Sequence, residues 1–402
     1  MSEHQLNTRG IVLLAIMGGI ITANAYYIHP IIGRVAGSFG VSDSAIGAVP
    51  ALNQIALALG VLLLLPLGDR MSNRRLAIIC LSVQVLALIV MAAVENFYTF
   101  VVASTLLGFF TVTPYLLPTY ASKHVDTRRL GFVTAVLTTG VIAGVQLSRV
   151  SSGIIGEYLG WRSVYWIAAA LMTCATFVIP MLLKEPPVKT GKVSAQSYPR
   201  LIHSMWELAL SYPRVIMSGL IQGFSFAIFL TVWLGIGLHL TSDQIGLGTD
   251  VVGYLAGFSA IGLMMTARLG KWADNFGAER ARVVMACVQF LGILCLALAI
   301  NNWWFLLLPI VIMSIVGPLI DVTGRIVSLN QAPAIRTRLM TLYVTVMFIV
   351  AGIGSWAATF AYDVGGWYGT IALASSLSIL VCLLSIQQYL AIRADTVQSD
   401  EF

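Results

Sequence analysis

The chain has 402 residues, of which 58% are hydrophobic and only 10% are charged. Soluble domains carry about 25% charged residues, so this composition excludes an ordinary water-soluble protein and indicates one that lies in a lipid bilayer. The formal net charge of +6 at pH 7 does not indicate a nucleic-acid partner, because the basic residues occupy short turns between apolar segments.

Apolar segments long enough to cross a membrane follow one another along the chain. A transmembrane helix needs about 20 mostly apolar residues. Six such segments precede a polar stretch, at 11–34, 46–67, 76–94, 97–121, 131–156 and 161–183. Six more follow it, at 215–240, 251–269, 283–300, 303–327, 339–362 and 367–392. The sequence therefore predicts an all-α membrane protein of twelve transmembrane helices in two six-helix halves.

The polar stretch divides the chain into an N-terminal half (1–183), a cytoplasmic linker (184–213) and a C-terminal half (214–402). Within the linker, apolar residues recur at helical spacing and predict a short amphipathic helix on the inner membrane surface. Nearly all Lys and Arg residues fall on one side of the predicted membrane, and the exceptions are Arg34, Arg149 and Arg162. The positive-inside rule therefore predicts that both termini are cytoplasmic.

Two short motifs occur once in each half. Residues 67–72 after the second span have a counterpart at 272–277 after the eighth. A second set, Glu157, Gly160 and Trp161, has the counterparts Asp363, Gly366 and Trp367. The two offsets are nearly equal, which predicts an internal duplication with pseudo-two-fold symmetry. Transporters built in this way place their binding site between the repeats.

The segment after the second span resembles the signature of the major facilitator superfamily, G-x-L-A-D-R-x-G-R-R. Here it reads Leu65-Pro66-Leu67-Gly68-Asp69-Arg70-Met71-Ser72-Asn73-Arg74-Arg75, with both glycines replaced. Residues 24–30, Asn-Ala-Tyr-Tyr-Ile-His-Pro, look like the Asn-x-Tyr-Tyr-x-Gln-Pro segment of bacterial efflux permeases in that superfamily, and Asn330-Gln331 fits the same branch. The resemblance covers essentially the whole chain. It implies the major facilitator fold in a bacterial inner membrane, with alternating access around a central cavity.

The first motif predicts a gate at the cytoplasmic side. A carboxylate there can pair with arginines and with the partial positive charge of a helix N-terminus. In the family, this contact holds the two halves together and breaks on inward opening. The expected gating residues are Asp69, Arg70, Arg74, Arg75 and, in the second half, Asp274. The alternative is a positive-inside anchor with one compensating acid.

The fifth span carries small residues at every fourth position, a stripe that lets another backbone approach closely. They are Gly140, Gly144, Ser148, Ser152, Gly156 and Gly160. The stripe resembles the antiporter motif of the family, G-x-x-x-G-P-x-x-G-G, but Val145 replaces its proline and Ser148-Arg149 its last two glycines. Tight helix packing alone and a conformational role in antiport both remain open.

Arg149 is a charge within an apolar span, where an unpaired arginine costs at least ~3 kcal/mol. Facing a watery cavity, it would bind an anionic or carbonyl group of a solute; the alternative is an ion pair with Glu157 or another acid. The other residues expected to line the cavity are polar or aromatic members of the spans. They are Asn24, Tyr27, His29, Gln54, Tyr115, Gln146, Gln222, Phe226, Trp233 and Tyr343.

Asp321 and Arg325 form the predicted proton-coupling pair. They lie four residues apart on one helix face, and Asp321 is the sole carboxylate well inside a predicted span. Acids within the membrane are functional by default in transporters, although structural pairing with Arg325 is the alternative. His29 is a second titratable candidate.

No GxSxG, HExxH or Walker sequence occurs in the chain, and its histidines lack metal-ligand spacing. We therefore expect no enzyme activity, cofactor or metal, and a driving force that is an ion or solute gradient. The leading hypothesis is proton-coupled efflux of a small organic or drug-like solute. Alternatives are uptake or facilitated diffusion of a small metabolite, including an anionic one, and a membrane sensor that moves no solute. Expected partners are the solute, protons and membrane lipid, and we expect a monomer.

Overall fold

The computed structural model describes residues 8–125, 129–183, 198–300 and 302–400 of the chain. Within these ranges the regular structure consists of α-helices and short 3-10 turns, with no strand. Ten stretches of the described residues are long and apolar enough to cross a membrane. The prediction of an all-helical membrane protein is confirmed.

The chain forms two compact units. Unit 1 comprises residues 1–41, 48–198 and 240–257. Unit 2 comprises residues 42–47, 199–239 and 258–402. Each unit therefore includes a short segment from the other half of the sequence.

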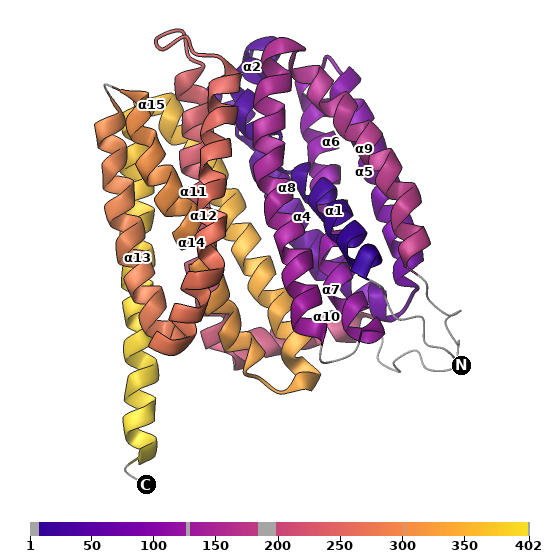
Figure 1. Cartoon of the computed structure of the whole chain (residues 1–402), viewed down its shortest axis with the longest axis vertical. Coiled ribbons are helices and arrows are strands. Elements are labelled where there is room, and N and C mark those ends of the chain that lie inside the picture. The colour runs from indigo at the N-terminus through magenta and orange to yellow at the C-terminus, as the bar shows by residue number, and fades with distance from the viewer. Residues whose placement is uncertain (1–7, 126–128, 184–197, 301, 401–402) are drawn as a thin grey trace. The chain divides into compact units, whose positions relative to one another are not determined.

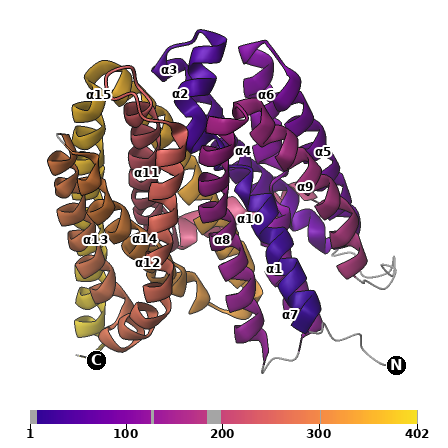
Figure 2. The same ribbon diagram turned by 45° about the horizontal axis from the view of Figure 1, so that its top comes forward.

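Unit 1 is a bundle of helices in which three pairs pack most extensively: α1 with α8, α5 with α9, and α4 with α6. The helices α5 and α9 run side by side in both ribbon views (Figures 1 and 2). The helices of unit 1 are α1 (Thr8–Ala23), α2 (Ile28–Phe39), α4 (Ala48–Leu64), α5 (Asn73–Ala93), α6 (Phe97–Phe110), α7 (Thr113–His124), α8 (Leu130–Tyr158), α9 (Trp161–Leu182) and the first residues of α12 (Thr249–Phe276).

Unit 2 is built around α13, which packs on both α14 and α15 (Figure 2). Its helices are α3 (Asp43–Ile46), α10 (Tyr198–Ser211), α11 (Pro213–Leu240), the rest of α12, α13 (Ala278–Leu294), α14 (Leu307–Leu329) and α15 (Pro333–Asp400). Gly366 has a φ of 55° and a ψ of −141°, so α15 consists of two helices in succession. Glycine adopts this conformation without the steric cost that a side chain imposes.

The small-residue stripe of α8 lies directly against α1. An ideal Cβ placed on Gly144 would stand 2.2 Å from the carbonyl oxygen of Gly19, and one on Gly140 would stand 2.2 Å from that of Ala15. No side chain larger than hydrogen fits at either position. The two backbones therefore touch, which is the close approach that small residues permit between membrane helices.

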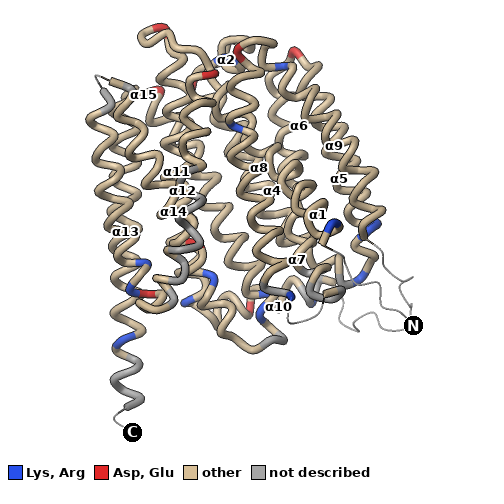
Figure 3. Tube along the Cα trace, viewed as in Figure 1, with Lys and Arg blue, Asp and Glu red and all other residues tan. Residues whose placement is uncertain are grey.

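Charged residues concentrate toward the ends of the helices in each unit, and long stretches of helix between them carry none (Figure 3). Exceptions include Arg149 in α8 and Asp321 in α14. Because a charge away from water is expensive, such residues are the first candidates for a functional site.

Candidate functional site

The first membrane-length stretch is broken between α1, which ends at Ala23, and α2, which begins at Ile28. Pro30 explains the break, because proline has no N–H and its ring clashes with the carbonyl four residues earlier, that of Tyr26. Across the break the N–H of Tyr26 bonds to the Ala23 oxygen at 2.9 Å, and that of His29 bonds to the Tyr26 oxygen at 3.3 Å. Broken helices often border the substrate site in transporters.

Arg149 of α8 lies close to this break. Its side chain is 1% exposed, its Nε donates to the carbonyl of Val145 at 3.3 Å, and its Nη2 donates to Oε1 of Gln146. Its guanidinium lies in the neighbourhood of the side chains of Tyr26 and His29. The structure therefore brings together three predicted cavity residues, Gln146, Arg149 and His29.

His29 and Gln54 are both fully buried beside Tyr26. The imidazole of His29 meets the Tyr26 ring edge-on, with 5.4 Å between centroids, and Gln54 of α4 lies next to the Tyr26 hydroxyl. Among the residues that the structure describes, neither ring nitrogen of His29 has a hydrogen-bond partner. We name Tyr26, His29, Gln54, Gln146 and Arg149 the α1–α2 polar cluster.

Tyr26 is a member of this cluster that was not predicted from the sequence, where Tyr27 was expected instead. The spacing of residues could have predicted Tyr26, because residues three apart share a helix face and Tyr26 precedes His29 by three.

Three other predicted cavity residues of unit 1 lie outside this cluster. Asn24 donates from Nδ2 to the carbonyl of Ile21 at 3.2 Å, Tyr27 is buried, and Tyr115 near the start of α7 is half-buried.

The predicted cytoplasmic gate is only partly within the described part of the chain. The 3-10 turn Leu65–Asp69 follows α4, but the side chains of Asp69 and Asp274 lie outside the described residues. The guanidinium of Arg70 lies 5.7 Å from the centroid of the Tyr198 ring. Arg74 and Arg75, in the first turn of α5, are exposed. The gate therefore stays a prediction.

In unit 2, Asp321 of α14 is held by two partners. Nε of Arg325 lies 2.9 Å from each carboxylate oxygen, and the hydroxyl of Tyr343 donates to Oδ1 at 2.9 Å. The side chains of Asp321 and Arg325 are 23% and 30% exposed. The carboxylate is thus ordered by an arginine and a tyrosine, and it remains partly exposed.

Aromatic rings lie along α11. Phe226 stacks on Phe229 with 5.6 Å between centroids and meets Phe348 of α15 edge-on at 5.9 Å. Trp233 is 2% exposed, which favours a packing contribution, whereas Phe226 is only partly buried. Gln222, one turn before Phe226, is buried, and its Oε1 has no hydrogen-bond partner in the described part of the chain.

Unit 2 also contains a buried cation that was not predicted. Nη1 of Arg282 donates to Oγ of Ser218 at 3.1 Å and to Oε1 of Gln388 at 3.0 Å, while Gln388 donates from Nε2 to the carbonyl of Arg214 at 3.1 Å. These contacts join α11, α13 and α15. Arg282 lies immediately before the predicted span 283–300, where a basic residue is ordinary, so the sequence gives no sign of its burial.

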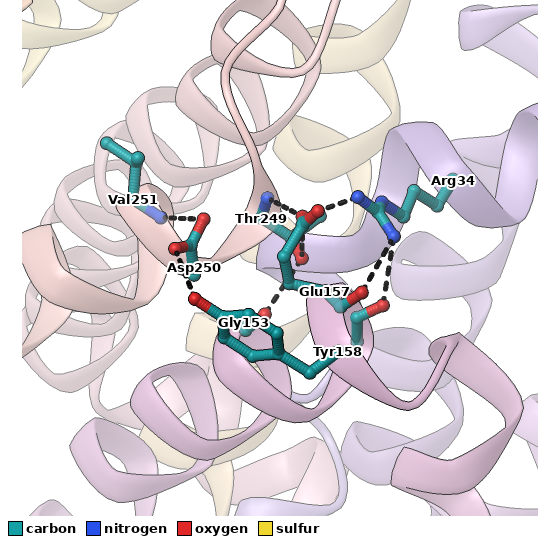
Figure 4. A network of polar contacts seen from close by, with 8 residues as sticks. Arg34, Gly153, Glu157, Tyr158, Thr249, Asp250 and Val251 are labelled. Atoms are coloured by element: carbon teal, nitrogen blue, oxygen red, sulfur yellow. Dashed lines mark hydrogen bonds and ion pairs between the residues drawn. The ribbon is translucent and has the colours of Figure 1, made fainter.

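Glu157 near the C-terminal end of α8 links three segments of unit 1 (Figure 4). Its carboxylate forms an ion pair with Arg34 of α2. Its Oε2 also accepts hydrogen bonds from the backbone N–H of Thr249 at 2.7 Å and from the Thr249 hydroxyl at 3.2 Å. Arg34 donates in addition to the carbonyls of Gly156 and Glu157, at 3.1 and 3.4 Å. We name Arg34, Glu157 and Thr249 the Glu157 network.

The network sits where α8 and the first turns of α12 are in backbone contact. An ideal Cβ on Gly153 would stand 2.6 Å from the Thr249 oxygen and 2.9 Å from Cα of Gly253. Thr249 is the first residue of α12, so Glu157 supplies an acceptor to one of the N–H groups that a helix start leaves unsatisfied. The negative charge also suits the positive end of the helix dipole.

We compared the chain with protein families and with other proteins, and the following matches are to transport proteins. The chain matches the Major Facilitator Superfamily over residues 14–300 and 237–394. It is 26% identical over 389 residues to the transporter YgaY of Escherichia coli O157:H7, covering 95% of this chain and 96% of that protein. It is 22% identical over 292 residues to the multidrug resistance protein MdtG of Salmonella paratyphi A, covering 66% of this chain and 69% of that one.

Solved structures of similar fold have much lower sequence identity. The nucleoside transporter NupG superposes with a TM-score of 0.71 at 14% identity, over 95% of this chain and 98% of that one. An inward-facing bacterial homologue of the human lysosomal transporter Spinster gives a TM-score of 0.73 at 12% identity, over 96% and 99%. At these identities the likeness concerns the fold alone.

Proposed function

Because the chain belongs to the Major Facilitator Superfamily, we propose that it is a monomeric secondary transporter that exports a small organic solute in exchange for protons. The solute crosses by alternating access. The name of MdtG, a multidrug resistance protein similar to this chain, supports export. The charged and aromatic groups of the two units support a solute with both polar and apolar parts.

The proposed topology has twelve transmembrane helices in two six-helix halves, with both termini in the cytoplasm of a bacterial inner membrane. Ten stretches meet the length and hydropathy of a span. One of them, 335–394, includes the break at Gly366 and can therefore supply two spans. The helix α12, with 28 residues, can supply another. These features support the twelve-helix count.

In this proposal, Asp321 is the residue that binds the coupling proton. Its carboxylate lies inside α14 and accepts hydrogen bonds from Arg325 and Tyr343 at 2.9 Å. Protonation would cancel the ion pair and make the carboxyl group a donor, so the local arrangement differs between the two states. A group of this kind can link proton binding to a change in helix packing.

The test uses proteoliposomes with and without a pH gradient and a panel of anionic, neutral and cationic solutes, for example benzoate, chloramphenicol and ethidium. We expect Asp321→Asn to abolish gradient-driven movement while exchange at equal pH survives. The matched control is Asp363→Asn, which removes an exposed acid of α15 and should leave coupling intact. Persistent gradient-driven transport in Asp321→Asn refutes the coupling role; absence of flux for every solute in the wild type refutes transport.

A further inference from the structure

We propose that Tyr198, the first residue of α10, is a positioning residue that ties the predicted linker to the turn after α4. This turn, Leu65–Asp69, contains part of the predicted cytoplasmic gate. The inference deepens the proposed function and rests on it for one point only, that movement of the turn accompanies transport. The contact itself can be measured without any flux.

The end of α4 leaves a backbone acceptor that the linker reaches. The helix ends at Leu64 and continues as the 3-10 turn Leu65–Asp69, in which each carbonyl accepts from the third residue after it. In that pattern the carbonyl of Leu63 would accept from residue 66, which is a proline and has no N–H. The hydroxyl of Tyr198 donates to this carbonyl at 2.5 Å. A side chain of the linker therefore serves an acceptor whose 3-10 partner is missing.

The ring of Tyr198 makes a second contact, at the other end of the same turn. The guanidinium of Arg70 lies 5.7 Å from the centroid of this ring, within the range of a cation–π interaction. The N–H groups of Arg70 and Met71 both bond to the carbonyl of Leu67 at 2.9 Å. The arginine is thus fixed to the turn by its backbone. Hydroxyl and ring together hold the segment at residues 63 and 70.

Apolar packing holds the turn to the rest of unit 1. The side chains of Leu65, Leu67 and Met71 pack against a buried cluster that includes Leu76 of α5 and Leu116 of α7. Apolar contacts are not directional, whereas a hydrogen bond depends on the direction of its donor. The hydroxyl of the linker tyrosine therefore adds an orientation that packing alone does not supply.

The helix α10 continues from this contact into the second unit. It runs without a break from Tyr198 to Ser211, and all of it after Tyr198 belongs to unit 2. Within unit 2, Nη1 of Arg338 donates to Oγ of Ser204 at 3.4 Å, and Met205 is 2% exposed. Backbone hydrogen bonds join the successive turns of a helix, so its first residue moves with the residues that follow. Movement of α10 therefore acts on the turn after α4 through Tyr198.

The experiment compares two substitutions: Tyr198→Phe keeps the ring and removes the hydroxyl, and Tyr198→Leu removes both. Hydrogen–deuterium exchange of the detergent-solubilised full chain is followed in peptides that cover 65–72. We expect the Arg70 and Met71 amides to exchange roughly three- to tenfold faster in Tyr198→Phe, the equivalent of one ordinary hydrogen bond, and faster still in Tyr198→Leu. The matched control is Tyr212→Phe, because Tyr212 lies in the same linker and its hydroxyl has no hydrogen bond to a residue that the structure describes.

Transport kinetics in proteoliposomes separate a positioning role from a purely structural one. We expect Tyr198→Phe to lower the maximal rate several-fold while KM changes by less than about twofold and the thermal midpoint stays at the wild-type value. Unchanged exchange in both Tyr198 variants, or equal acceleration in Tyr212→Phe, overturns the proposal. Faster exchange with wild-type flux overturns the positioning role. Faster exchange in a protein whose wild type moves no solute supports the contact and refutes the proposed function.

Discussion

The substitution Glu157→Ala tests how firmly the Glu157 network holds the first turn of α12. It removes the acceptor of the Thr249 N–H and hydroxyl, at 2.7 and 3.2 Å, and the ion pair with Arg34. A hydrogen bond to a charged acceptor contributes about 1.5–3 kcal/mol, and a partly exposed ion pair about 0.2–1 kcal/mol. Because the side chains of Arg34 and Glu157 are 37% and 24% exposed, solvent replaces part of both interactions. We therefore expect local opening of this turn to become about 2 kcal/mol easier.

The assay is hydrogen–deuterium exchange of the purified protein, followed in peptides that cover 246–253. At about 1.4 kcal/mol for each factor of ten, exchange at the Thr249 amide should accelerate roughly 30-fold in Glu157→Ala. Glu157→Gln should have a smaller effect, because its amide oxygen still accepts from Thr249 while the charge is lost.

The neighbouring Asp250 provides the matched control. Its oxygens accept from the adjacent N–H of Val251 at 2.9 Å and from the Tyr158 hydroxyl at 3.4 Å (Figure 4). Asp250→Asn therefore removes an acid from the same turn without removing the acceptor of Thr249. Unchanged exchange in Glu157→Ala, or equal acceleration in Asp250→Asn after correction for intrinsic rates, would refute the reasoning.

Three other substitutions test separate features. Gly144→Ala places a methyl group 2.2 Å from the Gly19 oxygen, so α1 and α8 must separate, and we expect a loss of about 1–3 kcal/mol seen as a lower thermal midpoint. Tyr343→Phe removes the 2.9 Å hydrogen bond to Asp321, worth about 1.5–3 kcal/mol, and should slow gradient-driven transport in proteoliposomes. Asp69→Asn should leave expression nearly intact, raise cysteine accessibility from the cytoplasm and reduce transport, as the predicted gate requires.

Each of these tests has a result that contradicts it. Gly37→Ala is the control for the glycine contact, because a Cβ there meets nothing within 4 Å. An equal fall in thermal midpoint for Gly37→Ala and Gly144→Ala would mean that helix contact is not the cause. Wild-type rates in Tyr343→Phe would show that the hydroxyl has no part in coupling. Unchanged accessibility together with normal flux in Asp69→Asn would exclude the gate.

Apolar segment lengths were sufficient to predict an all-helical membrane protein, because a transmembrane helix satisfies its own backbone within one continuous segment. The break in the first span was not predicted, although Pro30 is its visible cause. The ion pair of Arg34 with Glu157 joins residues far apart in the chain, so no local pattern indicates it. Burial of Arg282 depends in the same way on Gln388, a residue of another helix. The pairing of Asp321 with Arg325 could be predicted because both lie on one turn of one helix.

The backbone contact between α1 and α8 has a mechanical consequence. At Gly19 and Gly144 no side chain separates the two helices, so neither can roll about its own axis without a steric clash. The two helices therefore move together as one rigid pair. In α8, Arg149 lies little more than one turn from the glycine contact at Gly144, and Glu157 lies about two turns further along the helix. Any tilt of the pair therefore moves Arg149 and Glu157 together, with a larger displacement at Glu157, near the end of α8, than at Arg149.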